Sequence, residues 1–263
     1  MKLGFIGAGN MASAIIKSLI KAESKFELLA FDVDFDKLSL LSNLGVTPCK
    51  NIANLASDSD YIVLAVKPQN IEEVLVDIKS NIKKSAVVIS IAAGITAEYI
   101  KKELGYDAKV VLVMPNTPLM LGVGATALAH IAPVSDAEFN NVRNIFDCAG
   151  ITAEVASDKM KEIIAINGSS PAFIYAFAKA FVDYAVSEDI DENEAKRLFS
   201  QTLIGSAKMI TDSGNSLDKL IEMVSSKGGT TIAGLSAFEE LNLNKTVNEA
   251  CTRCTKRAYE LSK

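Results

Sequence analysis

Short apolar segments alternate with amphipathic segments over the first 156 residues of the chain. The segments with helical period lie between them, and Asp34–Leu44, Thr96–Leu104 and a stretch opened by the capping-box pair Ser135 and Glu138 are examples. Alternation of this kind predicts a parallel, doubly wound α/β sheet. The predicted strands are 2–6, 28–32, 61–66, 86–91, 110–113, 125–131 and 151–155.

From Ser157 onward the pattern changes, because every segment has the helical period and none alternates like a strand. Pro171 suits the first turn of a helix, Asp191 and Glu194 have capping-box spacing, and Gly214 would end the helix 195–213. Further helices are expected at about 230–241 and 246–262. We therefore predict two domains, 1–156 with the sheet and 157–263 all helical.

The first predicted strand runs directly into Gly7-Ala8-Gly9-Asn10-Met11-Ala12, and a helix follows at 13–22. Gly7 permits the tight turn, Gly9 lets a pyrophosphate approach the backbone, and Ala12 lets the helix pack closely on the sheet. The helix N-terminus offers N–H groups to phosphates. With Asp32 ending the next strand, this pattern predicts a Rossmann-type dinucleotide site.

Composition excludes several classes of function. A net charge of −5 with scattered lysines and arginines is not the basic footprint of a nucleic-acid-binding protein. No apolar run reaches membrane-spanning length, and we expect no signal peptide because the first strand begins at residue 2. The four cysteines are too few and too unevenly placed for a disulfide framework, so a cytoplasmic location is expected.

A polar loop between two predicted helices, Ser225-Ser226-Lys227-Gly228-Gly229-Thr230-Thr231, is the second candidate site. Its two glycines free the backbone to turn N–H groups inward, and hydroxyls add donors, which suits a carboxylate. A plain helix-to-helix turn is the alternative. The small polar segment Asn167-Gly168-Ser169-Ser170-Pro171 is a further candidate, with a helix kink as its alternative.

Lys67-Pro68 and Met114-Pro115-Asn116-Thr117-Pro118 each follow a predicted strand at its carboxyl end, the edge where open α/β sheets bind ligands. Cys251 and Cys254 have CxxC spacing without a second pair or a nearby histidine, so we expect packed thiols and no metal site.

His130, the single histidine, lies in a predicted strand, where we expect a structural role. Reduction of a carbonyl normally needs a placed proton donor, most often histidine. A protonated imine needs none, since its carbon is already electrophilic.

Together these motifs resemble the pyrroline-5-carboxylate reductase family over nearly the whole chain. The motifs that carry the resemblance occur in the family's order: 6–12, Ala65-Val66-Lys67-Pro68, Ser90-Ile91-Ala92-Ala93-Gly94, 114–118, Gly168-Ser169-Ser170-Pro171-Ala172 and 228–231. The resemblance implies reduction of a cyclic imine to L-proline by NAD(P)H, with a helical dimerisation domain. Dimers of family members often assemble further into rings.

Carried over by motif, residues 7–12 would hold the pyrophosphate, Ala65 to Pro68 would line the nicotinamide and ribose, and Asn51 would lie near the adenosine. Thr231 would hydrogen-bond the imine nitrogen. The residues expected around the substrate are Ser226, Gly228, Gly229, Thr230, Ser169 and Ser170, and Asn116 is added to the cofactor set.

Two departures from the family pattern concern specificity. Lys227 replaces the proline of the family's Ser-Pro-Gly-Gly-Thr-Thr loop, and the His-Pro pair usual upstream is absent around Asn215-Ser216-Leu217, so a related cyclic imine acid is an alternative substrate. Asp32 would accept the ribose 2′-OH and repel a 2′-phosphate, which favours NADH over NADPH.

Two other functions are compatible with a dinucleotide-binding sheet followed by helices. A β-hydroxyacid dehydrogenase would need a catalytic lysine in the helical part, where Lys159, Lys161 and Lys179 are the candidates. A non-catalytic NAD(H)-binding protein would keep the site at residues 7–12 and would have no need of the segment Gly228–Thr231.

Overall fold

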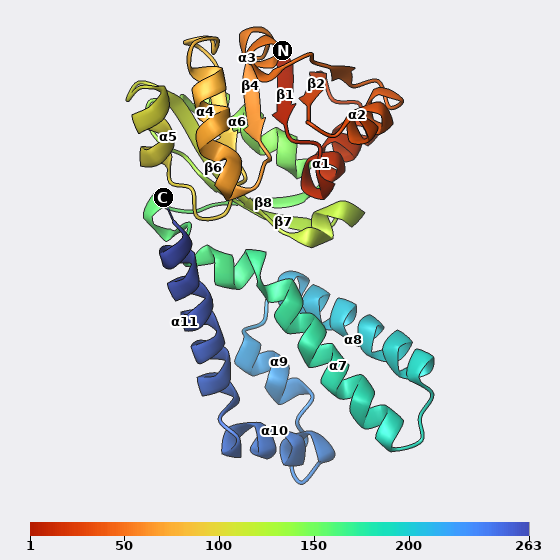
Figure 1. Cartoon of the computed structure of the whole chain (residues 1–263). Helices are drawn as coiled ribbons and strands as arrows, with labels where there is room; N and C mark the ends of the chain where they lie inside the picture. Colours follow the sequence, from red (N-terminus) through yellow and green to blue (C-terminus); the bar gives the residue numbers. More distant parts are fainter. Residues whose placement is uncertain (263) are drawn as a thin grey trace. The chain divides into compact units, whose positions relative to one another are not determined.

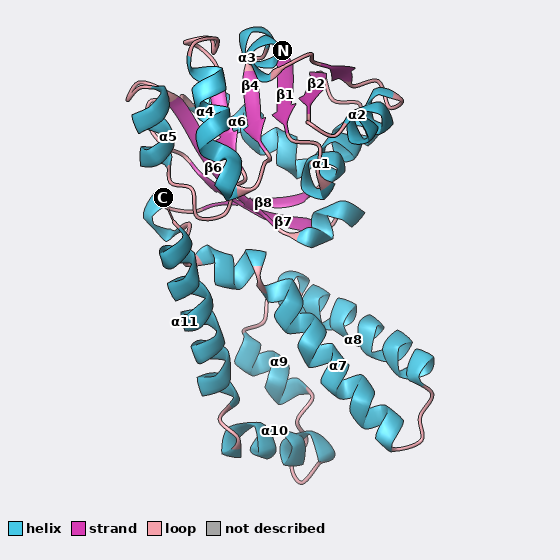
Figure 2. Cartoon of the chain, in the orientation of Figure 1, coloured by secondary structure: helices cyan, strands magenta, loops and turns pink. Residues whose placement is uncertain are grey.

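The computed structural model describes residues 1–262, and within them eight strands form one sheet in the order β3-β2-β1-β4-β5-β6-β7-β8 (Figures 1 and 2). The strands are β1 (Lys2–Ile6), β2 (Glu27–Phe31), β3 (Thr47–Pro48), β4 (Tyr61–Leu64), β5 (Val87–Ser90), β6 (Lys109–Pro115), β7 (Gly124–Ala129) and β8 (Gly150–Glu154). β1 pairs in parallel with β2 on one side and with β4 on the other. The strand order therefore reverses at β1, and ligands of doubly wound sheets bind at this switch point.

Helices cover both faces of the sheet. One core cluster joins the strands to α1 (Asn10–Lys21), α2 (Phe35–Ser42) and α6 (Asp136–Asp147). The other joins them to α3 (Ile52–Asp58), α4 (Ile71–Lys79) and α5 (Ala97–Leu104). Because helices cover both faces of the central strands, their sequences are nearly continuous apolar runs, and every residue of β4 and β5 is buried. The predicted doubly wound fold is confirmed.

The expectation of a wholly parallel sheet is wrong at one end. β7 runs antiparallel to β6, and β8 pairs in parallel with β7. The connection from β6 to β7 holds only a short 3₁₀ turn, η2 (Thr117–Leu121). A parallel crossover needs a dozen or more residues, so this short connection forces the antiparallel return.

Helix caps follow the sequence signals. Ser135 and Glu138 form the predicted capping box at the start of α6. Asp34 caps α2 by accepting hydrogen bonds from two backbone N–H groups, and a hydrogen bond from Lys37 lowers the pKa of this carboxyl below its ordinary value. Asp191 accepts the N–H of Glu194, which is half of the expected box.

The described residues after Glu154 contain no strand, as the sequence predicts. Their helical segments are the 3₁₀ turn η3 (Ser157–Lys159), the π-helical η4 (Ile164–Gly168), α7 (Ser170–Ser187), α8 (Glu192–Asp212), α9 (Leu217–Met223), α10 (Thr230–Glu240) and α11 (Leu243–Leu261). No helix within residues 1–262 combines the length and apolarity needed to cross a bilayer.

The chain divides into two compact units. The first contains Met1–Pro171 and the chain's end from Arg253, and the second contains Ala172–Thr252. Residues 157–171 and the last turns of α11 thus group with the sheet, whereas the predicted boundary lies between residues 156 and 157. Contacts of η4 with β6 and β7 account for part of this difference.

Candidate active site

The glycine loop between β1 and α1 has the geometry that the dinucleotide fingerprint requires. Gly7 has φ of +102°, and a Cβ there would lie 2.6 Å from the carbonyl oxygen of Ala65. Gly9 has open space around it and caps α1 without a side-chain hydrogen bond, which leaves first-turn N–H groups for a ligand. Asn10 and Met11 open the helix, and Ala12 is buried against the sheet.

Asp32 follows β2 and holds the glycine loop. Its Oδ2 accepts the backbone N–H of Ala8 at 2.7 Å, and its Oδ1 accepts that of Asp34 at 2.8 Å. Each carboxylate oxygen keeps a second lone pair that could accept a ribose hydroxyl. Sequence reasoning assigned Asp32 to the cofactor alone and missed this support of the loop, because a loop-to-strand contact leaves no periodic signal.

The residues after β4 and before α3 occupy the same carboxyl edge as the glycine loop. Ala65 donates its N–H to Ile6 at 2.9 Å, and Lys67 caps the 3₁₀ turn η1 (Pro68–Asn70). Asn51 caps α3, with its side-chain oxygen accepting the N–H of Asn54 at 2.8 Å. The glycine loop and the segment after β4 lie side by side, because a Cβ on Gly7 would come within 2.6 Å of the Ala65 carbonyl oxygen.

Asn116 belongs to a side-chain network that the sequence did not reveal. Its Oδ1 accepts the N–H of Ala125 at 2.9 Å, and its Nδ2 donates to Oδ1 of Asn167 at 3.3 Å. Asn167 is buried in the π-helical segment and donates to the carbonyl oxygens of Met114 at 2.7 Å and Ala125 at 3.0 Å. The two amides thus tie the end of β6 to the start of β7.

The segment 167–171, for which a helix kink was the alternative to a ligand site, contains a π-helical turn followed directly by α7. Ser169 accepts a hydrogen bond from the Cys254 thiol at 3.2 Å, and Ser170 donates to the carbonyl of Ile166. Cys251 and Cys254 carry free thiols, and the described residues contain no cluster of side chains that could hold a metal. In the sequence, the only indication that Asn167 has a special role is that it begins a short polar segment in an otherwise apolar helical region.

The loop before α10 lies in the second unit and has a compact turn. Gly229 donates its N–H to the carbonyl of Ser226 at 2.9 Å, and a Cβ on Gly229 would lie 2.5 Å from the Ser226 hydroxyl. Gly228 has φ of +75°, and Gly229 caps α10 without a side-chain hydrogen bond. Thr230 and Thr231 follow in the first turn, so their N–H groups have no partner within the helix.

His130 has the structural role expected of it. Its ring stacks on Phe139 with centroids 4.5 Å apart, and Nε2 lies 2.8 Å from the carbonyl oxygen of Val134. Of the lysines that a rival dehydrogenase could use, Lys159 pairs with Asp158 and Lys179 with Asp183, both at the surface.

Comparison with known proteins identifies the family. Residues 157–261 match the family model described as pyrroline-5-carboxylate reductase dimerisation, and residues 2–94 match that of NADP oxidoreductase, coenzyme F420-dependent. The pyrroline-5-carboxylate reductase of Escherichia coli K12 is 35% identical, over 100% of this chain and 98% of its own. The chain belongs to the pyrroline-5-carboxylate reductase family.

Solved structures of family members agree with this assignment. A pyrroline-5-carboxylate reductase from Coxiella burnetii superposes with a TM-score of 0.92 at 33% identity, covering 99% of this chain and 98% of that one. The Plasmodium falciparum enzyme, solved with NADP bound, has a TM-score of 0.89 at 29% identity, covering 100% and 98%. The resemblance inferred from the ordered motifs is confirmed. The roles of individual residues carried over from those motifs stay predictions.

Proposed function

We propose that this chain reduces 1-pyrroline-5-carboxylate to L-proline with a reduced nicotinamide dinucleotide. The observation that carries the proposal is identity of 35% along the entire chain with an enzyme named for this substrate. The presence of both the glycine loop and the Gly228–Thr231 loop in one chain supports it, since a protein that only binds NAD(H) has no need of the second.

The residues of the glycine loop fit a dinucleotide. A Cβ built on Gly9 would meet no atom within 4 Å, so the space beside this backbone is open to a phosphate. The first turn of α1 presents N–H groups, and Asp32 has lone pairs for a ribose hydroxyl. When bound, the reduced nicotinamide supplies the hydride. Residues 65–68 at the neighbouring strand end would line its ring and ribose, and Asn51 and Asn116 would complete the cofactor set.

The substrate is a cyclic imine with a carboxylate. The N–H groups at the start of α10 and the hydroxyls of Ser226 and Thr230 suit the carboxylate, while Thr231 would hydrogen-bond the nitrogen. A protonated imine already carries the proton that its nitrogen keeps after reduction, so the site requires orientation more than acid catalysis. The structural engagement of His130 is consistent with this chemistry.

Turnover is the first prediction. The purified protein should oxidise NADH or NADPH when given pyrroline-5-carboxylate and should form proline, measured by nicotinamide absorbance and amino-acid analysis. A homologous six-membered imine acid serves as the comparison, because Lys227 in the loop could widen substrate choice. A folded sample that turns over neither cofactor with the five-membered substrate would disprove the proposal.

We predict a preference for NADH, because the charge of Asp32 opposes a 2′-phosphate. Asp32→Ser should shift the ratio of kcat/KM values towards NADPH. Asp32→Asn is the matched variant, since it removes the charge and keeps an acceptor for the Ala8 N–H. Both variants should shift the ratio in the same direction, and a wild-type preference for NADPH would contradict this role of Asp32.

We predict a homodimer or a ring of dimers in solution. Within the second unit, α9 and α10 have no buried residue and α8 buries only Ala195. Large apolar side chains on α7, α8 and α10 are exposed in one chain, among them Tyr175, Tyr184, Leu198, Ile210 and Phe238. Exposed apolar surface of this extent marks an interface. Light scattering at micromolar concentration should give an even multiple of the chain mass, and a monomer would contradict the prediction.

The four free cysteines favour the cytoplasm, and fractionation of the host cell would test this location.

A further inference from the structure

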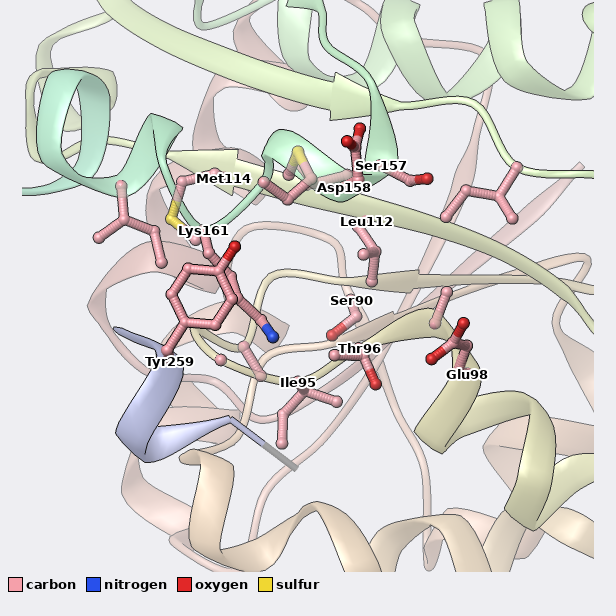
Figure 3. Close-up of a pocket in the computed structure, with 17 residues that line it drawn as sticks. Ser90, Ile95, Thr96, Glu98, Leu112, Met114, Ser157, Asp158, Lys161 and Tyr259 are labelled. Carbon is pink, nitrogen blue, oxygen red and sulfur yellow. The ribbon is translucent and has the colours of Figure 1, made fainter. Parts of the chain in front are cut away.

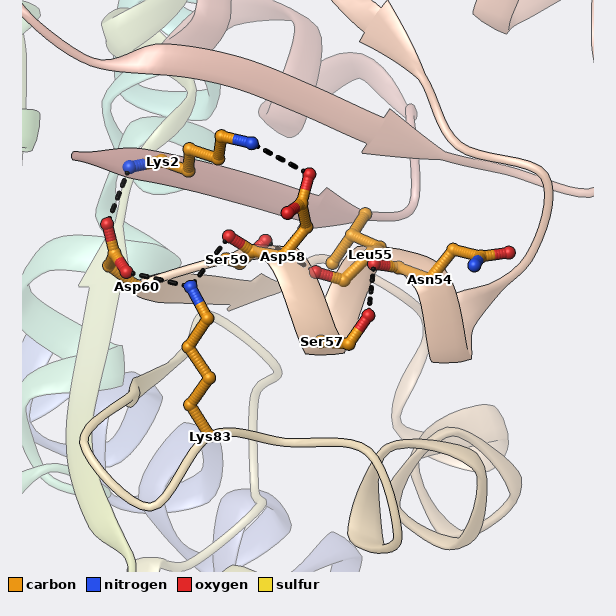
Figure 4. A network of polar contacts seen from close by, with 8 residues as sticks. All are labelled: Lys2, Asn54, Leu55, Ser57, Asp58, Ser59, Asp60 and Lys83. Atoms are coloured by element: carbon orange, nitrogen blue, oxygen red, sulfur yellow. Dashed lines mark hydrogen bonds and ion pairs between the residues drawn. The ribbon is translucent and has the colours of Figure 1, made fainter.

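A pocket of about 410 Å³ lies in the sheet-containing unit, and none of the residues that line it was assigned above to cofactor or substrate (Figure 3). The ends of β5 and β6, the turn 92–96, the first turn of α5, the segment 157–164 and Tyr259 near the end of α11 line it. Gly94 in that turn has φ of +81°, and a Cβ there would lie 3.3 Å from the carbonyl oxygen of Leu261, so α11 closes tightly on the turn. A pocket of this size can hold a small molecule.

Ser90 is an unpaired polar group in the lining. It ends β5, is 2% exposed, and its Oγ has no hydrogen-bond partner among the described residues. Buried hydroxyls in proteins are almost always paired, because an unpaired one has lost its bonds to water without replacement. In the close-up, the Ser90 hydroxyl turns towards the same space as the amine of Lys161 (Figure 3). A ligand in the pocket could supply the missing partner.

Lys161 gives the pocket a positive charge. Its side chain is half-buried, and Nζ lies 4.4 Å from the centroid of the Tyr259 ring. No carboxylate of the described residues lies within ion-pair distance of this nitrogen. Tyr259 donates to Oε1 of Glu162 at 2.8 Å, and this hydrogen bond raises the pKa of the phenol, so the ring stays neutral. The cation–π contact leaves the ammonium free to bind an anion.

The first turn of α5 adds to this positive potential. Thr96 caps the helix by accepting the N–H of Tyr99 at 3.2 Å, and Ala97 and Glu98 follow it in the lining. The first N–H groups of an α-helix have no partner within the helix, and they carry the positive end of its dipole. Both features favour negative charge at this end of the pocket.

The two acidic residues in the lining lie at its exposed margin, and the half-buried Glu162 lies behind the lining, where it accepts the Tyr259 hydroxyl. Glu98 is exposed, and Asp158 is exposed and pairs with Lys159 at 3.3 Å. The remaining walls are apolar side chains that are buried or half-buried: Ile95, Leu112, Met114, Ile131, Met160 and Ile164. The interior therefore combines one cation, one unpaired hydroxyl and an apolar surface.

We infer that this pocket is a second ligand site, separate from the reductase site, which binds a small carboxylate with an apolar body. The carboxylate pairs with the Lys161 ammonium and accepts hydrogen bonds from the first turn of α5. The Ser90 hydroxyl donates a hydrogen bond to the ligand, whose aliphatic part packs on Ile95 and Leu112. Either a simple aliphatic acid or an aliphatic amino acid carries this chemistry.

Titration calorimetry on the full-length protein tests the inference with 4-methylpentanoate, L-leucine and 4-methylpentanamide. The acid should bind saturably and about tenfold or more tightly than the amide, since the amide lacks the charge. If leucine binds more tightly than the acid, the rim carboxylates select an amino acid. If it binds more weakly, the site takes a simple acid.

Variants locate the binding. Lys161→Met keeps the apolar stem, and Ser90→Ala removes only the hydroxyl. Each should weaken binding of the preferred acid, by about tenfold or more for the lysine. Lys159→Met removes a neighbouring surface charge and Thr231→Val alters the substrate loop, and both should bind like the wild type. Equal binding of acid and amide, no saturable binding, or wild-type affinity in both pocket variants would overturn the inference.

Discussion

Thr231→Val is expected to lower kcat/KM for pyrroline-5-carboxylate about tenfold to a hundredfold. Valine keeps the shape of threonine in the first turn of α10 and removes one hydrogen bond to a nitrogen that is charged before the hydride arrives. Such a bond contributes about 1.5 to 3 kcal/mol, and its loss from the transition state lowers the rate by the corresponding factor. Steady-state kinetics with saturating cofactor measure the effect.

The matched control is Thr231→Ser, which restores the hydroxyl and should recover most of the activity. The Kd for NADH and the free energy of unfolding should change little in either variant, because the glycine loop and Thr231 belong to different compact units. If Thr231→Val turns over the substrate like the wild type, the hydroxyl does not bind the imine nitrogen, and Thr231 is only a residue of the first turn of α10.

Gly7→Val is expected to destabilise the fold by about 3 kcal/mol or more. The native φ of +102° is strained for any residue with a Cβ and most of all for a β-branched one. In addition, the new Cβ would lie 2.6 Å from a backbone oxygen, which cannot rotate away. Denaturant unfolding followed by circular dichroism gives the change in the free energy of unfolding.

Gly9→Ala in the same loop provides the contrast. Its φ of −69° and ψ of −177° suit alanine, and no atom lies within 4 Å of the added methyl. Stability should therefore stay within about 0.5 kcal/mol of the wild type, while the Kd for the dinucleotide rises because the methyl occupies the approach of the pyrophosphate. Equal loss of stability in both variants would show that the loop needs small residues for folding alone.

Local chemistry made the elements of the sheet and their ligand edge predictable. Fully buried strands appear in the sequence as apolar runs. Helix starts are marked by the capping residues Asp34, Ser135 and Thr96, and the dinucleotide loop is marked by the spacing of its glycines. The antiparallel direction of β7 was not predicted, because an apolar run does not show which way a strand runs in the sheet. The short connection between β6 and β7 would have indicated it.

Contacts between distant segments were not predictable from one sequence. Asn116 and Asn167 meet across 51 positions, and neither residue differs in its local pattern from an ordinary polar residue in a turn. The hydrogen bond between Asp32 and the Ala8 N–H is similar, since it joins two segments that the sequence had assigned separately to the same ligand. The pocket beside Ser90 depends on α11 returning to the sheet, and no periodicity reports such a return.

The outer strand β3 has a consequence for aggregation. It consists of Thr47 and Pro48 only, and the proline has no N–H to donate at the sheet's open edge. A strand of a neighbouring molecule could therefore form almost no backbone hydrogen bonds with β3, so edge-to-edge stacking into fibrils is blocked at this end. The apolar helices remain available for ordered assembly. Pro48→Val would restore an N–H and raise β-propensity at this border, which makes the position a gatekeeper of solubility.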